Sequence, residues 1–272
     1  MALAPRSPLV NVMVQAARKA AKGLLRDFTE VERLQVIAKG ASDFVSQADL
    51  RAEESLRADL ARARPDFGWL MEEGGAGGNG EWEHRWVADP LDGTTNFLHG
   101  VPHWAISIGV EKRLPDGGGE IIAGVVYSPV NDEMFVAEKG GGAFVNEHRL
   151  RVSGRREMAQ ALFATGIPFG AVPGKEAFSA ILAELMPQIA GVRRFGAAAL
   201  DLAWVAAGRY DAFWETGLKR WDLAAGLLLV REAGGYVTAP DGSDPYASGL
   251  VVAGNPQLQP RLREVVLRHV RA

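Results

Sequence analysis

The chain has 272 residues, of which 47% are hydrophobic, so it can bury a sizeable core in one large domain or in two tightly joined halves. Its 30 basic and 33 acidic residues give a formal charge of −3, which predicts no basic surface for nucleic acid or an anionic membrane. The absence of cysteine excludes disulfides, thiolate nucleophiles and cysteine-based metal sites.

The N-terminal residues 1–8 lack the basic-then-apolar order of a signal peptide. No apolar run approaches the roughly 18 residues of a membrane span. These features, with the absence of cysteine, predict a soluble cytoplasmic protein.

Stretches with apolar residues at helical spacing alternate in groups with short apolar runs, which predicts a mixed α and β protein built from stacked layers. The glycine-rich segment 74–80 is predicted to be a flexible loop. We expect helices at 9–28, 47–62, 175–189, 197–207, 222–232 and 256–270, and strands at 86–88, 104–110, 121–127, 133–138, 162–165, 210–214 and 250–253.

The segment 89–94, Asp-Pro-Leu-Asp-Gly-Thr, concentrates oxygen ligands directly after a predicted buried strand. Asp89 and Asp92 offer carboxylates, and Leu91 offers a carbonyl. Gly93 lets a ligand approach the main chain, where the following N–H groups can open a helix that holds phosphate. Such hard oxygen ligands suit Mg²⁺ or Mn²⁺ rather than zinc. An ordinary surface turn is the alternative, because Asp, Pro and Gly are common turn residues.

Two further acidic residues are candidates to complete a cluster with this segment. Glu72 precedes the glycine-rich segment, and Asp222 begins a predicted helix that continues with Ala-Ala-Gly at 224–226. Each also has a plain structural explanation when taken alone. Glu72 fits a solvated loop charge, and Asp222 fits a helix N-cap.

Four other patterns approach known motifs and fail on sequence, spacing or context. Residues 75–80 match G-x-G-x-x-G, but acidic residues follow them and no helix pattern does. Residues 170–175 are one residue short of a P-loop, and Glu176 replaces its Ser or Thr. His99 and His103 have Gly and Pro between them, which break a zinc-binding helix, and 89–94 lacks the acidic spacing of an EF-hand.

Five separated segments together resemble the inositol monophosphatase family. The D-P-x-D-G-T-x-N-F pattern and the later W-D-x-A-A-G pattern form a highly specific pair, and the resemblance runs from about residue 10 to the C-terminus. It implies a layered αβαβα sandwich of the sugar-phosphatase type, with halves of roughly 1–145 and 146–272. The segments are 39–43 with Asp49, 72–73, 86–97, 193–201, and Glu215 with 221–226.

The resemblance implies a magnesium-dependent phosphoric monoester hydrolase with two to three ions, for which Mn²⁺ is a possible substitute. Glu72, Asp89 and the carbonyl of Leu91 would hold one Mg²⁺. Asp89, Asp92 and Asp222 would hold a second, and a third, weaker ion would lie near Glu72. Two metals about 4 Å apart can clamp the attacking and leaving oxygens of an in-line displacement.

The resemblance also assigns catalytic and substrate roles. Thr94 would hydrogen-bond the attacking water, and Asp49 would orient the Thr94 hydroxyl, with Glu72 as a further catalytic residue. Lys39 matches a mobile-loop lysine only approximately, so its role is left open. The implied substrate contacts are Asp92, Gly93, Thr94, Thr95, Arg193, Ala198, Glu215 and Asp222.

The expected substrate is inositol 1-phosphate or a similar small polyol phosphate. Within the same fold, a histidinol-phosphate or fructose-1,6-bisphosphate phosphatase is the alternative, because these enzymes share the metal carboxylates. A regulatory protein with residual phosphatase activity is a second alternative. The resemblance further implies lithium sensitivity and a homodimer, and no nucleic-acid or membrane partner is expected.

Overall fold

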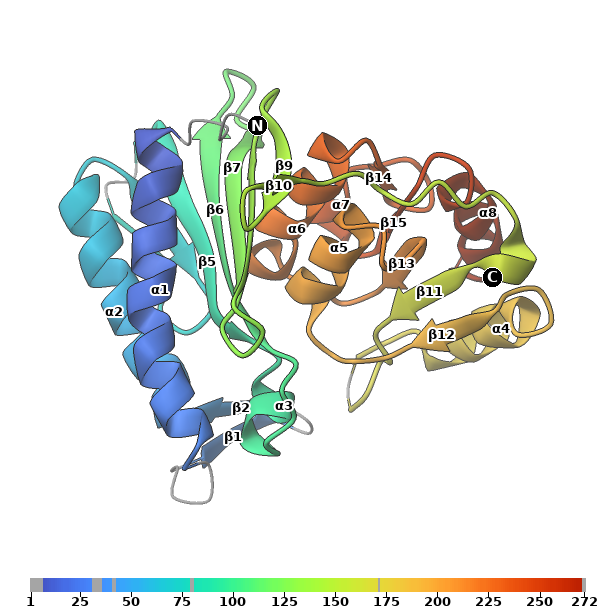
Figure 1. Ribbon diagram of the computed structural model, residues 1–272, viewed down its shortest axis with the longest axis horizontal. Helices are drawn as coiled ribbons and strands as arrows, with labels where there is room; N and C mark the ends of the chain where they lie inside the picture. The colour runs from blue at the N-terminus through green and yellow to red at the C-terminus, as the bar shows by residue number, and fades with distance from the viewer. Residues whose placement is uncertain (1–6, 31–35, 41–42, 79–80, 171, 271–272) are drawn as a thin grey trace.

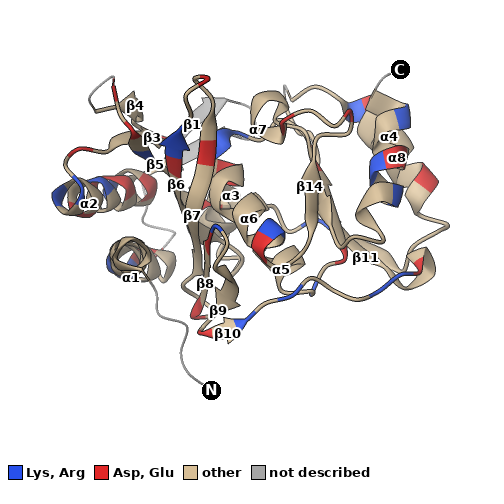
Figure 2. Cartoon of the chain, turned by 90° about the horizontal axis from the view of Figure 1, so that it is seen from above, with Lys and Arg blue, Asp and Glu red and all other residues tan. Residues whose placement is uncertain are grey.

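The computed structural model describes residues 7–30, 36–40, 43–78, 81–170 and 172–270. Over these residues the protein has five layers in the order helix, sheet, helix, sheet, helix (Figures 1 and 2), so the predicted αβαβα sandwich is confirmed. From one outer face to the other, the helical layers are α1 (Pro8–Phe28) with α2 (Gln47–Ala63), α5 (Ala198–Ala206) with α6 (Arg220–Glu232), and α4 (Lys175–Leu185) with α8 (Gln259–Val270).

The first sheet has eight strands in the order β10-β9-β8-β7-β6-β5-β3-β4. Its neighbours are antiparallel except for β3 and β5, which run parallel, so their carboxyl ends meet at one edge. The strands are β3 (Gly68–Met71), β4 (Gly75–Gly77), β5 (His84–Asp92), β6 (Ala105–Arg113), β7 (Gly119–Ser128), β8 (Glu133–Glu138), β9 (Gly142–Val145) and β10 (His148–Arg149).

The second sheet has five strands in the order β12-β11-β13-β15-β14. Two short α-helices, a 3-10 helix (Met158–Gln160) and a two-stranded hairpin complete the described elements. The strands are β11 (Leu162–Thr165), β12 (Gly191–Arg193), β13 (Ala212–Glu215), β14 (Tyr236–Thr238) and β15 (Val251–Gly254), the hairpin is β1 (Val36–Gly40) with β2 (Asp43–Ser46), and the helices are α3 (Thr94–Leu98) and α7 (Pro245–Ser248).

The central helix α6 is apolar on all sides because a sheet covers each of its faces. Every residue from 223 to 230 is buried. A Cβ at Gly124 of β7 would lie 2.9 Å from the Ala225 Cα, and one at Gly109 of β6 would lie 2.9 Å from the Ala224 Cβ. Glycines in the sheet opposite alanines in the helix therefore set the close distance between the two layers.

The outer helix α1 packs its C-terminal end against α3 and the loop that follows it. The Ser7 hydroxyl caps the first turn by accepting a hydrogen bond from the Val10 N–H at 3.2 Å. At the other end, the Phe28 ring lies 5.4 Å from the Phe97 ring and 5.5 Å from the Trp104 ring, measured between centroids. This aromatic cluster holds α3 and the loop after it in place.

The expected long elements are confirmed, with ends shifted by a few residues, and the flexible-loop prediction for 74–80 is wrong for 75–77. Those residues form β4, which pairs with β3. A Cβ at Gly77 would lie 2.5 Å from the Trp69 ring, so glycine permits this pairing. Asn79 and Gly80 lie outside the described residues, as do Ala41, Ser42 and Ala171 of the motifs above. The division into halves at 145/146 stays a prediction.

No helix in the described ranges is both long enough and apolar enough to span a bilayer.

Replacing Gly124 with valine forces a side chain into the backbone of α6. We expect a loss of about 1–3 kcal/mol in the free energy of unfolding, because the two layers must separate. Gly154→Val is the matched control, since Gly154 is exposed and has no atom within 4 Å of an added Cβ. Urea denaturation measures both, and equal losses in the two variants would contradict this explanation of the layer spacing.

Candidate active site

The candidate site begins where the parallel strands β3 and β5 end. Met71 pairs with Ala88, so Glu72 and Asp89 follow at neighbouring positions on the same edge of the sheet. Asp89 is 2% exposed, and its Oδ1 accepts a hydrogen bond from the Leu91 N–H at 2.8 Å.

A β-bulge separates the two aspartates of the segment. Asp89 is opposite Ser107 and Asp92 is opposite Ala105, so three steps along β5 match two along β6. Pro90 accounts for the irregularity, because it has no N–H to donate to the ladder. The bulge bends the end of β5 and lets both carboxylates serve one site.

The Asp92 carboxylate is held by the first turn of α5, which comes from the second half of the chain. Its two oxygens accept hydrogen bonds from the Ala198 N–H at 3.1 Å and the Ala199 N–H at 2.8 Å. Burial raises the pKa of Asp92 to about 6, against the lowering effect of the backbone donors, and the nearby Asp201 charge raises it further. Ala198 thus contacts Asp92 through its backbone N–H, and its contact with substrate stays a prediction.

Asp222 enters the site from the first turn of α6. Its Oδ2 accepts a hydrogen bond from the Lys219 N–H at 2.7 Å. Lys219 is the N-cap of α6 and Asp222 is the third helical residue, so the N-cap explanation for Asp222 is wrong, and its carboxylate bonds back to the N-cap backbone as in a capping box. Burial raises the pKa of Asp222, the Lys219 N–H lowers it, and the charges of Asp92, Glu72 and Glu215 raise it again. This backbone contact and a place beside the other carboxylates therefore coexist.

The four carboxylates lie close enough to disfavour one another's ionisation. Burial raises the pKa of Asp89 well above its usual range, and the charges of Glu72, Asp92 and Asp222 add to the effect, as does a hydrogen bond with Glu72. A divalent cation would offset both the burial and the mutual repulsion. The donors are all oxygens, which is the chemistry that Mg²⁺ prefers.

Within the described ranges, however, no three Asp, Glu or His side chains converge closely enough to hold a metal ion as they stand. The fit of a divalent ion to this site therefore rests on the chemistry and charge of the donors, and not on a formed coordination sphere.

The structure brings Thr94 and Asp49 together from distant parts of the chain. The Thr94 Oγ1 lies 3.0 Å from Asp49 Oδ1 and 3.1 Å from the Leu91 carbonyl oxygen, and its single hydrogen can serve one acceptor at a time. Asp49 sits in the first turn of α2, where its Oδ2 accepts from the Ser46 N–H at 2.9 Å and from the Ser46 hydroxyl. Burial raises the pKa of Asp49, and its hydrogen bonds with Ser46 and Thr94 lower it.

Gly93 forms the N-cap of α3 in the left-handed region, at φ 93°. A Cβ there would lie 3.0 Å from the His103 carbonyl oxygen and 3.2 Å from the Ala197 Cβ, so both the backbone conformation and the packing require glycine. The prediction that a helix opens at this point is confirmed. Thr95 is exposed in its first turn.

Glu215 ends β13 on the opposite side of the site. A Cβ at Gly166 would lie 1.8 Å from Glu215 Oε1, so the absence of a side chain there admits the carboxylate. Burial raises the pKa of Glu215 to about 8, and the charges of Asp201 and Asp92 contribute to the increase.

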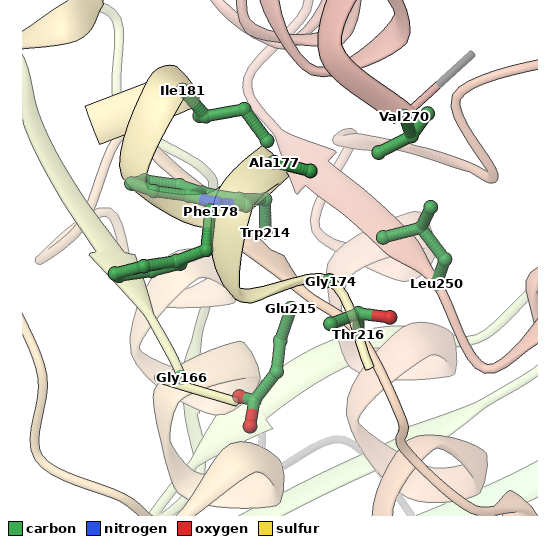
Figure 3. Close-up of a pocket in the computed structure, with 10 residues that line it drawn as sticks. All are labelled: Gly166, Gly174, Ala177, Phe178, Ile181, Trp214, Glu215, Thr216, Leu250 and Val270. Carbon is green, nitrogen blue, oxygen red and sulfur yellow. The ribbon is translucent and has the colours of Figure 1, made fainter. Parts of the chain in front are cut away.

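Behind Glu215 lies a largely apolar cavity of about 40 Å³ between α4, α8 and β13. Figure 3 shows the Glu215 carboxylate on the Gly166 side of this cavity and the rings of Phe178 and Trp214 on the other side. The cavity wall therefore supports the strand from behind, while the carboxylate faces away from the aromatic rings.

One predicted substrate residue contributes less to this geometry. Arg193 is exposed at the end of β12, where its Nη1 donates to the neighbouring Val192 carbonyl at 3.1 Å. Burial raises the pKa of both Asp201 and Glu215, and it is the charge of Arg194 that offsets this increase in part. Lys39 lies on β1 of the hairpin.

Sequence reasoning missed a polar contact at the floor of the site. His103 Nε2 lies 3.5 Å from Asp201 Oδ1, and both side chains are buried. Asn96 Nδ2 lies 2.7 Å from the carbonyl oxygens of both His103 and Phe195, which joins the loop after α3 to the segment before α5. A lone aspartate in the Ala- and Leu-rich run 197–207 was the available sequence signal.

Comparisons with known proteins match this chain over nearly its whole length. A family model described as the inositol monophosphatase family matches residues 6–272. An inositol-1-monophosphatase of Mesorhizobium japonicum is 52% identical over 98% of this chain and 99% of its own length. A Nus factor SuhB of Pseudomonas aeruginosa is 44% identical over 97% of both chains.

Solved structures show the same fold. The extragenic suppressor protein suhB of Bartonella henselae superposes with a TM-score of 0.90 at 50% identity, over 96% of this chain and 98% of that chain. An IMPase of Thermotoga maritima gives a TM-score of 0.86 at 30% identity, over 96% and 98% respectively.

Asp89→Asn should stabilise the metal-free protein, because it removes one of four mutually repelling carboxylates and keeps an oxygen for the Leu91 N–H. We expect the melting temperature at pH 7 to rise by a few degrees, where about 2–4 °C corresponds to 1 kcal/mol in domains of 150–250 residues. Because the folded-state pKa of Asp89 is raised, the wild-type carboxylate becomes protonated as the pH falls through that pKa, and its destabilising charge is lost. The difference in melting temperature between Asp89→Asn and the wild type should therefore narrow toward pH 4.

Asp211→Asn is the matched control for this melting experiment. Asp211 is also buried, but it accepts hydrogen bonds from the Leu162 N–H at 2.7 Å and from Arg155 Nη1 at 3.2 Å. Replacing Asp211 with asparagine weakens these contacts and should lower the free energy of unfolding by about 1–3 kcal/mol. A lower melting temperature for Asp89→Asn than for the wild type would contradict the repulsion.

Proposed function

The chain belongs to the inositol monophosphatase family, and from this premise we propose that it hydrolyses inositol 1-phosphate or a similar small polyol phosphate in a Mg²⁺-dependent reaction. Members of the family are phosphoric monoester hydrolases. The observation that carries the proposal is the cluster of Glu72, Asp89, Asp92 and Asp222 at the ends of β3 and β5 and the start of α6. The pKa of Asp89 and of Asp222 is raised by burial and further by the charges of the other carboxylates in this cluster.

The proposed metal ligands are those that the family resemblance implies. Glu72, Asp89 and the Leu91 carbonyl would hold one Mg²⁺, and Asp89, Asp92 and Asp222 would hold another. A third ion near Glu72 and replacement by Mn²⁺ are further predictions. When bound, the ions supply positive charge that activates water and offsets the charge of the phosphate.

Thr94 and Asp49 are proposed to aim the attacking water. When the Thr94 hydroxyl donates its single hydrogen to Asp49, its lone pairs are left to accept a hydrogen from water. The Asp49 carboxylate would thus fix the direction of the Thr94 O–H bond, and the Thr94 oxygen would in turn orient the water. The N–H groups at Gly93, Thr94 and Thr95 are proposed to receive the phosphate oxygens.

The alcohol part of the substrate would lie between Asp92, the start of α5 and Glu215. With a pKa of about 8, the Glu215 carboxyl is protonated at neutral pH in the absence of ligands, so it can both donate to and accept from a hydroxyl. A ring that carries several hydroxyl groups can therefore form hydrogen bonds with Asp92 and Glu215. Arg193 is kept as a proposed contact at the rim.

Two alternatives stand beside the first proposal. A histidinol-phosphate or fructose-1,6-bisphosphate phosphatase would use the same carboxylates. The relative named Nus factor SuhB supports in part a regulatory role with residual phosphatase activity. The complete set of carboxylates, with Thr94 and Asp49 in contact, supports catalysis. Lithium sensitivity, a homodimer and a cytoplasmic location stay predictions from the resemblance.

Phosphate release from a panel of inositol, sugar and histidinol phosphates tests the proposal, with and without Mg²⁺. We expect turnover on inositol 1-phosphate that disappears when EDTA removes the metal. Thr94→Val should lower kcat by about 10²–10⁴, the usual range for lost proton positioning, because valine has the shape of threonine without the hydroxyl.

Thr94→Ser, which keeps the hydroxyl, is the matched control and should retain most of the rate. Wild-type turnover by the valine variant would remove Thr94 from the mechanism. Absence of turnover on every member of the panel would remove the phosphatase proposal itself.

A further inference from the structure

A buried carboxylate on the first sheet forms hydrogen bonds with the first residue of α6. Glu111 of β6 is 1% exposed, and its Oε2 accepts hydrogen bonds from Arg85 Nε at 2.6 Å and Arg220 Nε at 3.1 Å. Arg220 Nη2 donates to the other oxygen, Oε1. Such two-armed contacts between arginine and a carboxylate fix direction as well as distance.

The two arginines belong to the two elements that carry candidate metal ligands. Arg85 lies on β5, four residues before Asp89, and side-chain alternation puts both on one face of the strand. Arg220 is the first residue of α6, two residues before Asp222. Glu111 therefore links the strand of one carboxylate to the helix of another.

Alternate residues of β6 all meet the beginning of α6. The Ser107 hydroxyl donates to the Trp221 carbonyl at 3.3 Å, and Gly109 lies under Ala224. Glu111 is the third residue on this face and supplies its charged contact. Space for it comes from Gly119 of β7, where a Cβ would lie 1.6 Å from Glu111 Oε1.

The other side of the Arg220 guanidinium is also covered. Its Cζ lies 4.8 Å from the centre of the Tyr246 ring, so the cation is held between a ring face and the Glu111 carboxylate. Only 20% of the Arg220 side chain is exposed. The Arg220 side chain thus has little conformational freedom, and its contacts also restrict the position of the first turn of α6.

We propose that Glu111 is a positioning residue for the active site: through Arg220 it fixes where α6 begins, and hence where Asp222 stands relative to Asp89. This inference rests on the proposed function, because it concerns the metal side of the same site. Glu111 acts through Arg220 and Arg85, and it contacts neither substrate nor metal.

A purely electrostatic role makes different predictions for the same residues. If only charge mattered, loss of Glu111 would weaken cation binding and loss of Arg220 would strengthen it. If position matters, loss of either partner weakens binding, and the double variant is no worse than the single ones. Arg220→Lys separates the two roles further, because it keeps the charge and loses the planar fork.

The test is a Mn²⁺ titration of the full-length, metal-free protein, with free Mn²⁺ measured by electron paramagnetic resonance. We expect Glu111→Gln, Arg220→Gln, Arg220→Lys and the Glu111→Gln/Arg220→Gln double variant each to weaken binding about 10-fold or more, the range found for residues that orient metal ligands. Circular dichroism checks the fold, and Glu111→Asp replaces Glu111→Gln if the latter does not fold.

Glu133→Gln is the matched control. Glu133 of β8 makes a comparable two-armed contact with Arg209, away from the start of α6, with Arg209 Nη1 2.7 Å from Glu133 Oε2. We expect its Mn²⁺ affinity to stay within about twofold of the wild type, well below the 10-fold change expected for positioning residues. An equal loss in the Glu133 variant would assign the effect to general destabilisation and overturn the inference.

The remaining outcomes separate the inference from the proposed function. If Arg220→Lys binds Mn²⁺ as tightly as the wild type, or Arg220→Gln binds it more tightly, the positioning role of Glu111 is overturned and the proposed metal site is unaffected. If the wild type itself binds no Mn²⁺, the metal assignment fails and takes the inference with it. Mn²⁺ binding without phosphatase activity in the wild type would leave positioning testable and remove only the proposed reaction.

Discussion

Mutual repulsion among buried carboxylates is the constraint on which the site depends. Asp89 and Asp92 are nearly removed from solvent, and Glu72 and Asp222 add charge from two other elements. Burial of like charges costs free energy unless something compensates for it. Backbone N–H donors compensate Asp92 and Asp222 in part, and a bound divalent cation is the natural partner for the rest. The folded protein thus holds at this point a strain that ligand binding would relieve.

The layered fold brings these carboxylates together from separate elements. The carboxylates come from the ends of β3 and β5 in the first sheet and from the start of α6 in the central layer, while the start of α5 holds Asp92. Glycines under alanines let α6 approach the first sheet closely, and Glu111 with Arg220 sets the position of its first turn. Small residues therefore determine the distance between layers, and a buried ion pair determines the helix start.

Much of this could be predicted from the sequence, because the ligand-rich segment 89–94 and the long periodic elements are local signals. The helix opening at Thr94 and the layered architecture followed from them and from the family resemblance. Other features depend on contacts between distant residues and leave no local trace. The donation from Ala198 and Ala199 to Asp92 spans more than 100 residues, and neither alanine has a polar side chain to reveal it. β4 was missed because Gly-Ala-Gly carries no strand signal.

Anomalous diffraction from crystals soaked in Mn²⁺ tests the central claim most directly, because it locates the ion without reference to turnover. We expect a strong anomalous peak within coordination distance of Asp89 and of at least two of Glu72, Asp92 and Asp222. A strongest peak elsewhere on the protein, or one that does not touch Asp89, would contradict it.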